Sequence, residues 1–326
     1  MKPEKSDACP DVQPDTWKEA VMASPGPESG RDALVLSLKG AAMGAADTVP
    51  GVSGGTVALI TGIYEKLLAA IRSVDATFLF LLFRGNFKSA LAHLHTRFLL
   101  FLFVGITAAV LSLARIVSHL LSDYPVLTWS LFFGLIAASV WSVGRKVAPR
   151  SAGAAVFFIA GGLFAWNLVG LVPAATPETL VFVFFSGMVA ICAMILPGIS
   201  GAFILVLLGK YEFIVATLRN PFLAENMIVI AVFVAGCGAG LAGFSRILKY
   251  LLERYRPLVL AFLTGLLLGS LRRIWPWKEW ETGANMMPDV SLGLLLPLGL
   301  MIAGACLIIL LEWVSIGERQ TGSCRN

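Results

Sequence analysis

Six long apolar stretches constrain the fold of this chain more than any other feature of its sequence. Each approaches or reaches the ~20 apolar residues that a helix needs to span the hydrocarbon core of a bilayer. Hydrophobic residues occupy 57% of the 326 positions and charged residues only 14%, far from the composition of a soluble domain. We therefore expect an all-α polytopic integral membrane protein. The six stretches are residues 98–113, 126–143, 152–172, 227–244, 257–271 and 290–311.

A repeated pattern of identical residues divides the chain into two similar halves. The paired residues lie 147 positions apart in the first part of each half and 131 positions apart further on. Duplicated units of this kind are common in membrane transporters. The spacing of 147 relates Pro50 to Pro197, Gly51 to Gly198, Ser53 to Ser200, Gly54 to Gly201, Tyr64 to Tyr211 and Glu65 to Glu212, and the spacing of 131 relates Gly105 to Gly236, Arg115 to Arg246 and Tyr124 to Tyr255.

Each half is predicted to contain the same set of helices. Residues 33–173 form the first repeat and residues 178–314 the second, each a Pro-Gly-broken, re-entrant helical hairpin followed by three transmembrane helices. Three crossings are an odd number, so the second repeat enters the membrane from the other side and the topology is inverted. Counting each hairpin as two full crossings leaves the number odd.

The distribution of charge predicts the orientation. Basic residues in short loops collect on one side of the predicted spans, and that side is expected to be cytoplasmic. This places both termini in the cytoplasm, with residues 1–32 as a disordered tail and residues 315–326 as a C-terminal tail. The same loops account for the net charge of +5, so we expect no nucleic-acid partner.

The two Pro-Gly breaks are the best-defined candidate site. Proline and glycine should end one helix before position 50, and a new helix should begin near the serine that follows, a residue that favours the N-cap. Broken backbone at membrane depth must be buried in protein or line a cavity, so the breaks should meet inside the molecule. Free N–H groups and helix dipoles there would bind an anion, although a tight turn between packed helices is the alternative. The candidate binding residues are Ser53, Gly54, Gly55, Thr56, Ser200 and Gly201.

Two arginines at equivalent positions are candidates for the same anion. Arg115 and Arg246 lie late in equivalent predicted helices and would point to opposite faces of an inverted pair. A guanidinium group matches phosphate oxygens in a bidentate manner. Snorkelling of both side chains to the nearest membrane interface is the alternative explanation.

Three acidic residues are candidates for coupling transport to an ion. Asp47 precedes the first break, and Met194 stands at its counterpart position, so the site is asymmetric there. Glu65 and Glu212 follow the broken helices at equal spacing, and intramembrane carboxylates mark function by default. Pairing of each glutamate with the arginine seven residues further on is the alternative.

Neither catalytic nor metal-binding patterns are visible. The three histidines at 93, 95 and 119 lie outside the repeat motifs, and no Ser/His/Asp order or metal-ligand cluster is present. We therefore expect no enzyme activity, no cofactor and no metal. Tryptophans 275, 277 and 280 are expected to form an interfacial aromatic belt.

The first motif, GAAMGAADTVPGVSGGT at 40–56 with GIYE at 62–65, resembles that of the bacterial and archaeal polyprenyl-phosphate transporters. The second motif, PGISG at 197–201 with GKYE at 209–212, repeats it, and the resemblance covers approximately residues 33–314. Ala202 departs from the pattern, because a small polar residue is expected there. The resemblance implies a flippase that returns undecaprenyl or polyprenyl phosphate from the outer to the inner leaflet of the cytoplasmic membrane for cell-envelope synthesis.

The physical interpretation leads in the same direction. A lipid phosphate has an anionic headgroup that must cross the hydrocarbon, and paired helix N-termini with arginines on either side suit that task. A small-anion or ion channel is the main alternative, because helix N-termini and glycines also line pores. An enzyme acting on lipid phosphates is the weaker alternative, because it would need a histidine nucleophile or a metal cluster.

Overall fold

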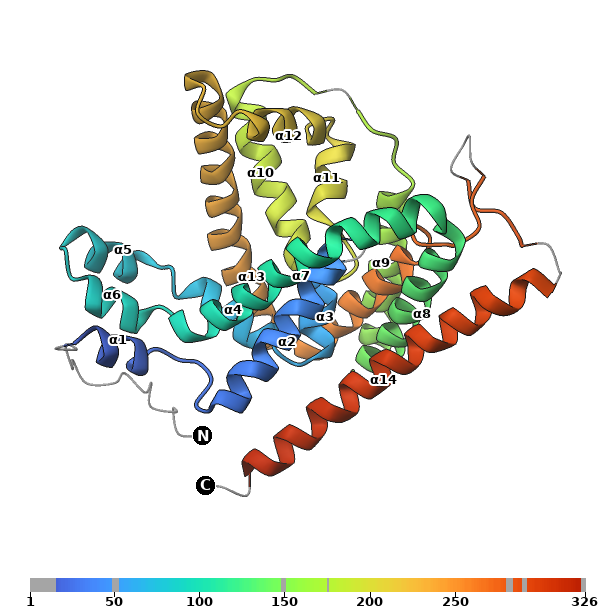
Figure 1. The fold of residues 1–326 in the computed structure, drawn as a ribbon, viewed down its shortest axis with the longest axis horizontal. Coiled ribbons are helices and arrows are strands. Elements are labelled where there is room, and N and C mark those ends of the chain that lie inside the picture. The colour runs from blue at the N-terminus through green and yellow to red at the C-terminus, as the bar shows by residue number, and fades with distance from the viewer. Residues whose placement is uncertain are drawn as a thin grey trace.

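A computed structural model shows an all-helical protein, as the composition predicts (Figure 1). It describes residues 16–48, 53–147, 151–174, 176–279, 284–288 and 292–323. Within these ranges, β-type pairing is limited to one isolated bridge between Lys278 and Asn285. The helices are α1 (Trp17–Ala23), α2 (Gly30–Asp47), α3 (Gly54–Ile60), α4 (Tyr64–Arg72), α5 (Ala76–Phe83), α6 (Phe87–His93), α7 (Thr96–Asp123), α8 (Pro125–Gly144), α9 (Ala152–Val169), α10 (Leu180–Ile195), α11 (Gly201–Leu207), α12 (Tyr211–Arg219), α13 (Ala224–Ser270), a 3-10 turn η1 (Leu292–Leu294) and α14 (Leu295–Ser323).

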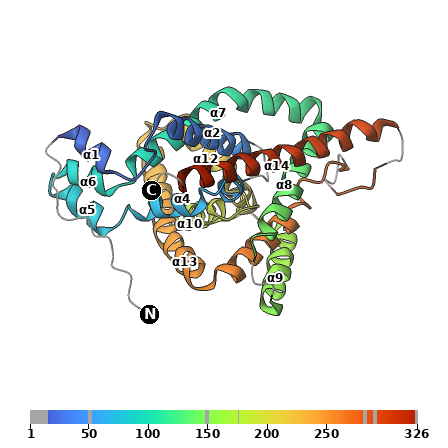
Figure 2. The same cartoon turned by 90° about the horizontal axis from the view of Figure 1, so that it is seen from below.

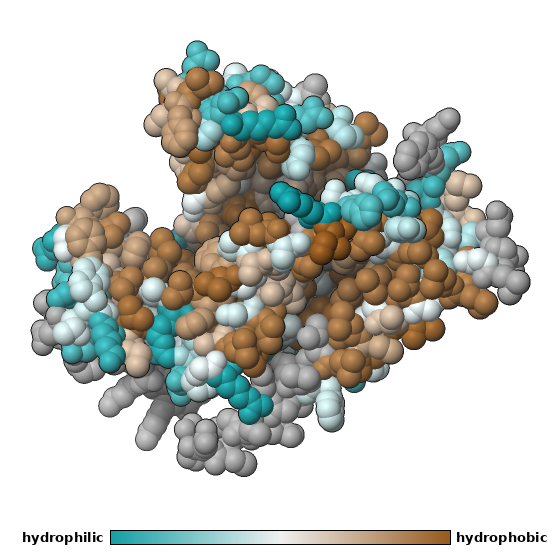
Figure 3. All heavy atoms as spheres, in the orientation of Figure 1, coloured by the Kyte–Doolittle hydropathy of each residue, from teal (hydrophilic) through white to brown (hydrophobic). Residues whose placement is uncertain are grey.

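The long helices make this a multi-pass membrane protein. α7, α8, α9 and α13 are long and apolar enough to cross a bilayer, and α14 begins with a further apolar segment. Large hydrophobic side chains on them face outward, such as Ile302 on α14, which is 65% exposed. Figure 3 shows hydrophobic residues across the face that α14 crosses, with hydrophilic residues gathered near α1 and α12. A surface of this kind requires lipid rather than water around it.

Two sharply bent helix pairs occupy the positions of the predicted hairpins. The chain bends by 117° between α3 and α4 and by 110° between α11 and α12. Gly62 (φ 73°) and Gly209 (φ 61°) lie at the bends, and a left-handed backbone favours glycine there. At both bends the residue after the glycine donates its N–H five residues back, Ile63 to Ala58 and Lys210 to Leu205. Each short helix thus ends in a Schellman motif.

The turn between the next two helices is also alike in the two halves. Tyr124 (φ −131°, ψ 53°) separates α7 from α8, and its counterpart Tyr255 (φ −131°, ψ 36°) interrupts α13. Pro125 begins α8, whereas Pro257 lies just inside the second part of α13. Proline lacks the N–H that would continue the helical ladder, which explains the bend. α13 therefore contains two of the six predicted spans.

Glycines bring the helices of the two halves into reciprocal contact. A Cβ on Gly134 of α8 would lie 1.9 Å from the carbonyl oxygen of Met301 on α14, and one on Gly265 of α13 would lie 2.1 Å from that of Phe158 on α9. α8 therefore packs on the last helix of the second half, and the second part of α13 packs on the last helix of the first (Figure 2). Equivalent helices thus exchange equivalent partners between the two halves, which is the pattern that a two-fold relation would produce.

The terminal segments contain more helix than the sequence predicts. Within 1–32, the expected disordered tail, α1 is capped by Thr16 and α2 begins at a capping box between Ser29 and Asp32. Ser24 after α1 accepts the backbone N–H of Arg97 at 3.1 Å, so α1 is tied to α7. The helical backbone of α14 continues through residues 315–323 of the expected C-terminal tail. Short polar capping signals, such as the box at Ser29 and Asp32, mark the helix starts that apolar length does not predict.

Candidate functional site

The two breaks meet inside the protein, as their sequence predicts. Ser53 Oγ donates to the carbonyl oxygens of Met194 at 3.2 Å and Leu196 at 3.5 Å. In return, the backbone N–H of Gly198 donates to Thr56 Oγ1 at 3.0 Å. Ser53 and Thr56 are each 1% exposed. The broken backbone of one half is thus satisfied by the other half, as membrane depth requires. Pro50 and Gly51 lie outside the described residues.

An aromatic hydroxyl adds to this interface. Tyr64 at the start of α4 is 2% exposed, and its hydroxyl donates to the carbonyl oxygen of Ile195 at 3.1 Å. Gly55 lies against the same carbonyl, because a Cβ there would be 2.8 Å from it. Tyr211, the counterpart of Tyr64 in the second half, is 43% exposed, so the two tyrosines have different surroundings. The last turn of α10 is therefore held by three groups of the first hairpin.

The N-terminus of α3 is occupied by side chains of the protein itself. Asp47 accepts the backbone N–H of Gly54 at 2.7 Å, and Ser53 Oγ accepts that of Gly55 at 3.1 Å. The prediction that this N-terminus presents free N–H groups is wrong for these two residues. A carboxylate suits the position because the positive end of the helix dipole stabilises it. In the conformation described, Asp47 takes the place that an external anion would take.

The N-terminus of α11 is different. Ser200 is its N-cap residue but makes no side-chain capping bond, and Met194 stands where the first half has Asp47. Ser200 is partly exposed and Gly201 is buried. The two breaks are therefore unequal, with a protein carboxylate at one and none at the other.

Arg115 and Arg246 lie on the helices that flank the broken elements. Arg115 is on α7, which packs along α2, and Arg246 is on α13, which packs along α10. Both are exposed, and Arg246 Nη1 donates to the carbonyl of Ala242 in its own helix at 2.8 Å. In the described part of the chain, no hydrogen bond or ion pair joins either arginine to a break. That arrangement fits snorkelling in this conformation.

The two coupling glutamates have different environments. Glu65 Oε1 forms an ion pair with Arg256 Nη2 at 2.8 Å, and both side chains are more than half exposed. The partner of Glu65 is therefore Arg256, from the bend in α13, and the alternative pairing with Arg72 is wrong. Position 125, the counterpart of Arg256, is a proline. Glu212 cannot make the equivalent pair.

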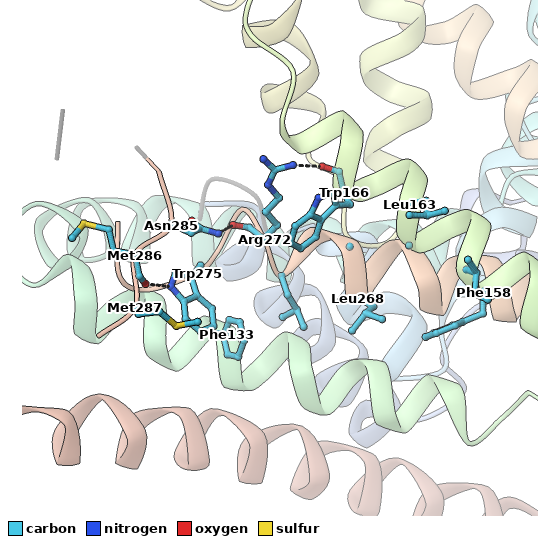
Figure 4. Close-up of a pocket in the computed structure, with 14 residues that line it drawn as sticks. Phe133, Phe158, Leu163, Trp166, Leu268, Arg272, Trp275, Asn285, Met286 and Met287 are labelled. Carbon is cyan, nitrogen blue, oxygen red and sulfur yellow. Dashed lines mark hydrogen bonds between the residues drawn. The ribbon is translucent and has the colours of Figure 1, made fainter. Parts of the chain in front are cut away.

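Two pockets lie near this assembly. A polar pocket of about 840 Å³ borders the first bend, lined by Gly62, Ile63, Lys39, Lys66 and His95 among others. An apolar pocket of about 620 Å³ lies between α8, α9 and the end of α13, where Trp166, Trp275 and Met287 line it with Arg272 at one side (Figure 4). Arg272 Nη1 donates to the carbonyl of Trp166 at 2.9 Å. The pocket at the first bend is lined only by residues between 25 and 98, whereas the apolar pocket is lined by residues of both halves.

Several residues of the site were not found from the sequence. In the sequence, Tyr64 stands out only as a member of the repeat. The side-chain bonds of Thr56 and Ser53 to the other break have no sequence signal. The bond of Asp47 to Gly54 has no such signal either, because Asp47 is the last residue of α2 and the N-cap of α3 is Ser53. Among the described residues, no group of three or more His, Cys, Asp or Glu side chains is placed to hold a metal.

These features define a class of protein: a polytopic helical membrane protein in which two broken helical hairpins meet at a buried polar interface. The chain belongs to the VCA0040-like family, described as undecaprenyl phosphate translocase-like, which it matches over residues 43–289. It is 44% identical over 255 residues to a polyprenyl-phosphate transporter of Vibrio cholerae, covering 77% of this chain and 82% of the relative. A polyprenyl-phosphate transporter of Staphylococcus aureus is 31% identical over 254 residues, covering 73% and 85% respectively. No solved structure matches the chain.

Proposed function

We propose that this protein is a flippase that moves polyprenyl phosphate, with undecaprenyl phosphate as its substrate, from the outer to the inner leaflet of the cytoplasmic membrane. The carrier lipid would return in this way for cell-envelope synthesis. The observation that carries the proposal is the contact between the two breaks at Ser53, Thr56 and Gly198. The relatives in Vibrio cholerae and Staphylococcus aureus are named for the same substrate.

The chemistry of the substrate suits this interface. The prenyl chain can remain in lipid while the phosphate crosses, so the protein needs a polar path only for the headgroup. Backbone N–H groups at a helix N-terminus bind phosphate without carrying a charge of their own. The uncapped start of α11 at Ser200 and Gly201 is the proposed first contact with the phosphate, and Ser53, Gly54, Gly55 and Thr56 provide the second.

Asp47 is proposed to control the second contact. Its carboxylate now holds the N–H of Gly54 and would repel an incoming phosphate. Protonation removes that negative charge and weakens the bond to Gly54, which frees the N-terminus of α3 for the substrate. A proton bound at Asp47 would thus accompany each phosphate. Glu65 and Glu212 remain the other coupling candidates.

The two-fold relation of the halves supports alternating access. We propose that the repeats are inverted in the membrane, with both termini in the cytoplasm. Rocking one half against the other would open the interface first to one leaflet and then to the other. Arg115 and Arg246 would then receive the headgroup at opposite faces, and the Glu65–Arg256 ion pair would break and re-form as α4 moves against α13.

The direct test is exposure of undecaprenyl phosphate at the outer leaflet of living cells. An externally added probe for the lipid headgroup is compared in cells with the protein, without it, and with Arg115→Ala or Arg246→Ala. We expect exposure to rise when the protein is lost and to stay high in both variants. Unchanged exposure in a strain that lacks other flippases would remove the lipid substrate and favour a small-anion channel, which bilayer conductance would then detect.

A further inference from the structure

We propose that Arg273 and Lys278, in the loop after α13, form a capture site for the phosphate of a lipid phosphate on its way to the second break. The inference rests on the proposed function and names a binding site within it. From the sequence, only the tryptophans of this loop are expected to have a role, as an interfacial aromatic belt.

The end of α13 places this loop beside the second break. A Cβ on Gly198 would lie 3.1 Å from Ser270 Oγ and 3.2 Å from the carbonyl oxygen of Leu266, so α13 ends in contact with the break. Three residues later, the guanidinium of Arg273 lies 5.1 Å from the ring centroid of Phe203. Phe203 belongs to the first turn of α11. Arg273 is therefore next to the helix N-terminus that no side chain caps.

Lys278 lies against Arg273. Its ammonium donates to the carbonyl oxygen of Arg273 and lies 5.0 Å from the ring centroid of Trp129 on α8. Burial and the nearby charge of Arg273 lower the pKa of Lys278 to about 8. Two cations held together in a partly buried place are unfavourable unless an anion lies near both.

Three other basic residues that have acidic partners show the contrast. Arg145 and Lys146 are also neighbours, but Glu312 lies between them at 3.0 and 3.2 Å. Arg256 has Glu65 as its partner. In the described ranges, neither Arg273 nor Lys278 makes an ion pair with an acidic side chain. Among the described residues, the pair thus has the charge to hold an anion and no acidic side chain that forms an ion pair with it.

The surroundings favour a lipid phosphate over free phosphate. A guanidinium can bind two phosphate oxygens and an ammonium a third. The apolar pocket of about 620 Å³ is lined by Arg272, the residue before Arg273, and by Trp275 of the same loop (Figure 4). It can receive the start of a prenyl chain while the headgroup lies at the cation pair. Inorganic phosphate would gain nothing from that pocket.

Binding of farnesyl phosphate, a short water-soluble polyprenyl phosphate, tests the site. Purified full-length protein in detergent is titrated by calorimetry with farnesyl phosphate, farnesol and inorganic phosphate. Arg273→Gln and Lys278→Gln should each weaken farnesyl phosphate binding about 10-fold, as expected for a lost charge-assisted hydrogen bond. Lys278→Arg keeps the charge and should restore most of the affinity. Farnesol binding should not change in any variant.

A matched control is available on the other side of the fold. Arg84 also lies over an aromatic ring, Phe80, at 4.2 Å, and Arg84→Gln should bind farnesyl phosphate like the unmodified protein. Thermal unfolding identifies a variant that has lost affinity through misfolding, and restored binding by Lys278→Arg excludes that cause. Equal affinity for inorganic and farnesyl phosphate would overturn the lipid assignment.

The double variant separates this site from the proposed function. If Arg273→Gln/Lys278→Gln binds farnesyl phosphate normally while the unmodified protein transports lipid, the capture site is wrong and the function stands. If the unmodified protein neither binds farnesyl phosphate nor changes the leaflet distribution of undecaprenyl phosphate, the function itself is wrong and the capture site fails with it.

Discussion

Asp47 at the end of α2 accepts the backbone N–H of Gly54 at the start of α3 at a distance of 2.7 Å. A negative charge of the protein thus lies at the helix N-terminus that the sequence marks as an anion site. The counterpart residue in the second half is Met194, so one break carries its own anion and the other does not. This asymmetry is the basis of the proposed exchange of a carboxylate for a phosphate.

Substitution of Asp47 separates its structural role from its charge. Asp47→Ala removes the acceptor of the Gly54 N–H and should lower the free energy of unfolding by ~1–3 kcal/mol, whereas Asp47→Asn keeps an acceptor and should cost less. If protonation of Asp47 accompanies transport, Asp47→Asn should abolish the dependence of transport on a proton gradient. Transport by Asp47→Asn that still responds to the gradient would assign coupling elsewhere.

Removal of the Thr56 hydroxyl should loosen the contact between the breaks. Thr56→Val leaves the buried N–H of Gly198 without its acceptor, which should cost ~1–3 kcal/mol. Thr217→Val is the matched control, because Thr217 is also buried and its hydroxyl bonds only to Phe213 in its own helix. Thermal unfolding in detergent compares the two. Equal losses would show that the contact between the breaks contributes nothing particular to stability.

Glycine substitutions test the reciprocal packing of the two halves. Gly134→Ala and Gly265→Ala each place a methyl group against a backbone carbonyl, and overpacking of this kind costs typically ~1–3 kcal/mol. Gly299 of α14 has open space at its Cβ position, so Gly299→Ala should be neutral or stabilise by up to ~1 kcal/mol. The two-fold relation predicts similar losses at 134 and 265. A loss at only one of them would contradict it.

The Glu65–Arg256 ion pair should contribute little to stability. Both side chains are more than half exposed, and exposed pairs of this kind are worth ~0.2–1 kcal/mol. A double-mutant cycle of Glu65→Gln and Arg256→Gln should return a coupling energy in this range that shrinks at high salt. A transport defect much larger than the change in stability would indicate that the pair acts in the movement of α4 against α13.

The pH dependence of headgroup binding follows from Lys278. Its pKa is lowered to about 8 from the ordinary value of 10.5, first by burial and then by Arg273. Because the folded state disfavours the charged form, stability should rise as the pH increases from about 8 towards 10.5. Lys278 loses its charge over the same range, so farnesyl phosphate binding should weaken above about pH 8. Arg273 is the charged group that acts on Lys278, and Glu279 follows Lys278 in the chain.

Lys278→Arg is the control for this titration. A guanidinium remains charged throughout the range, so the loss of affinity above about pH 8 should disappear in this variant. The second ionisation of the phosphate, near pH 6, is common to both proteins and cancels in the comparison. An unchanged alkaline loss in Lys278→Arg would assign it to another group.

Much of the fold could be predicted from the sequence, because membrane spans and repeats leave strong signals. Apolar length predicts the spanning helices, and the constant spacing predicts the paired Pro-Gly breaks. The bends at Gly62 and Gly209 were not predicted, although both glycines belong to the repeat. The segment at Trp17–Ala23 was missed, because its seven residues carry no apolar periodicity and only a Thr16 cap marks its start. The division of α13 into two predicted spans is confirmed, because Tyr255 leaves the helical conformation two residues before Pro257.

The site was predicted less completely than the fold. That the breaks meet followed from the cost of unsatisfied backbone in lipid. The identity of each bond did not follow, because hydroxyl-to-carbonyl bonds such as that between Tyr64 and Ile195 depend on the packing of distant segments. The Arg273–Lys278 pair was hidden for the same reason. Its significance lies in the nearness of two cations that form no ion pair among the described residues, which only the arrangement in space reveals.

Transport of lipid phosphate by the purified protein tests the central claim most directly. The protein is reconstituted into liposomes that contain radiolabelled undecaprenyl phosphate, and an external phosphatase releases phosphate only from molecules in the outer leaflet. With the unmodified protein, we expect the whole lipid pool to become accessible, and with Thr56→Val or Arg273→Gln/Lys278→Gln the protected inner fraction should be released slowly. A protected fraction that persists with correctly folded unmodified protein, with and without a proton gradient, would contradict transport of this lipid.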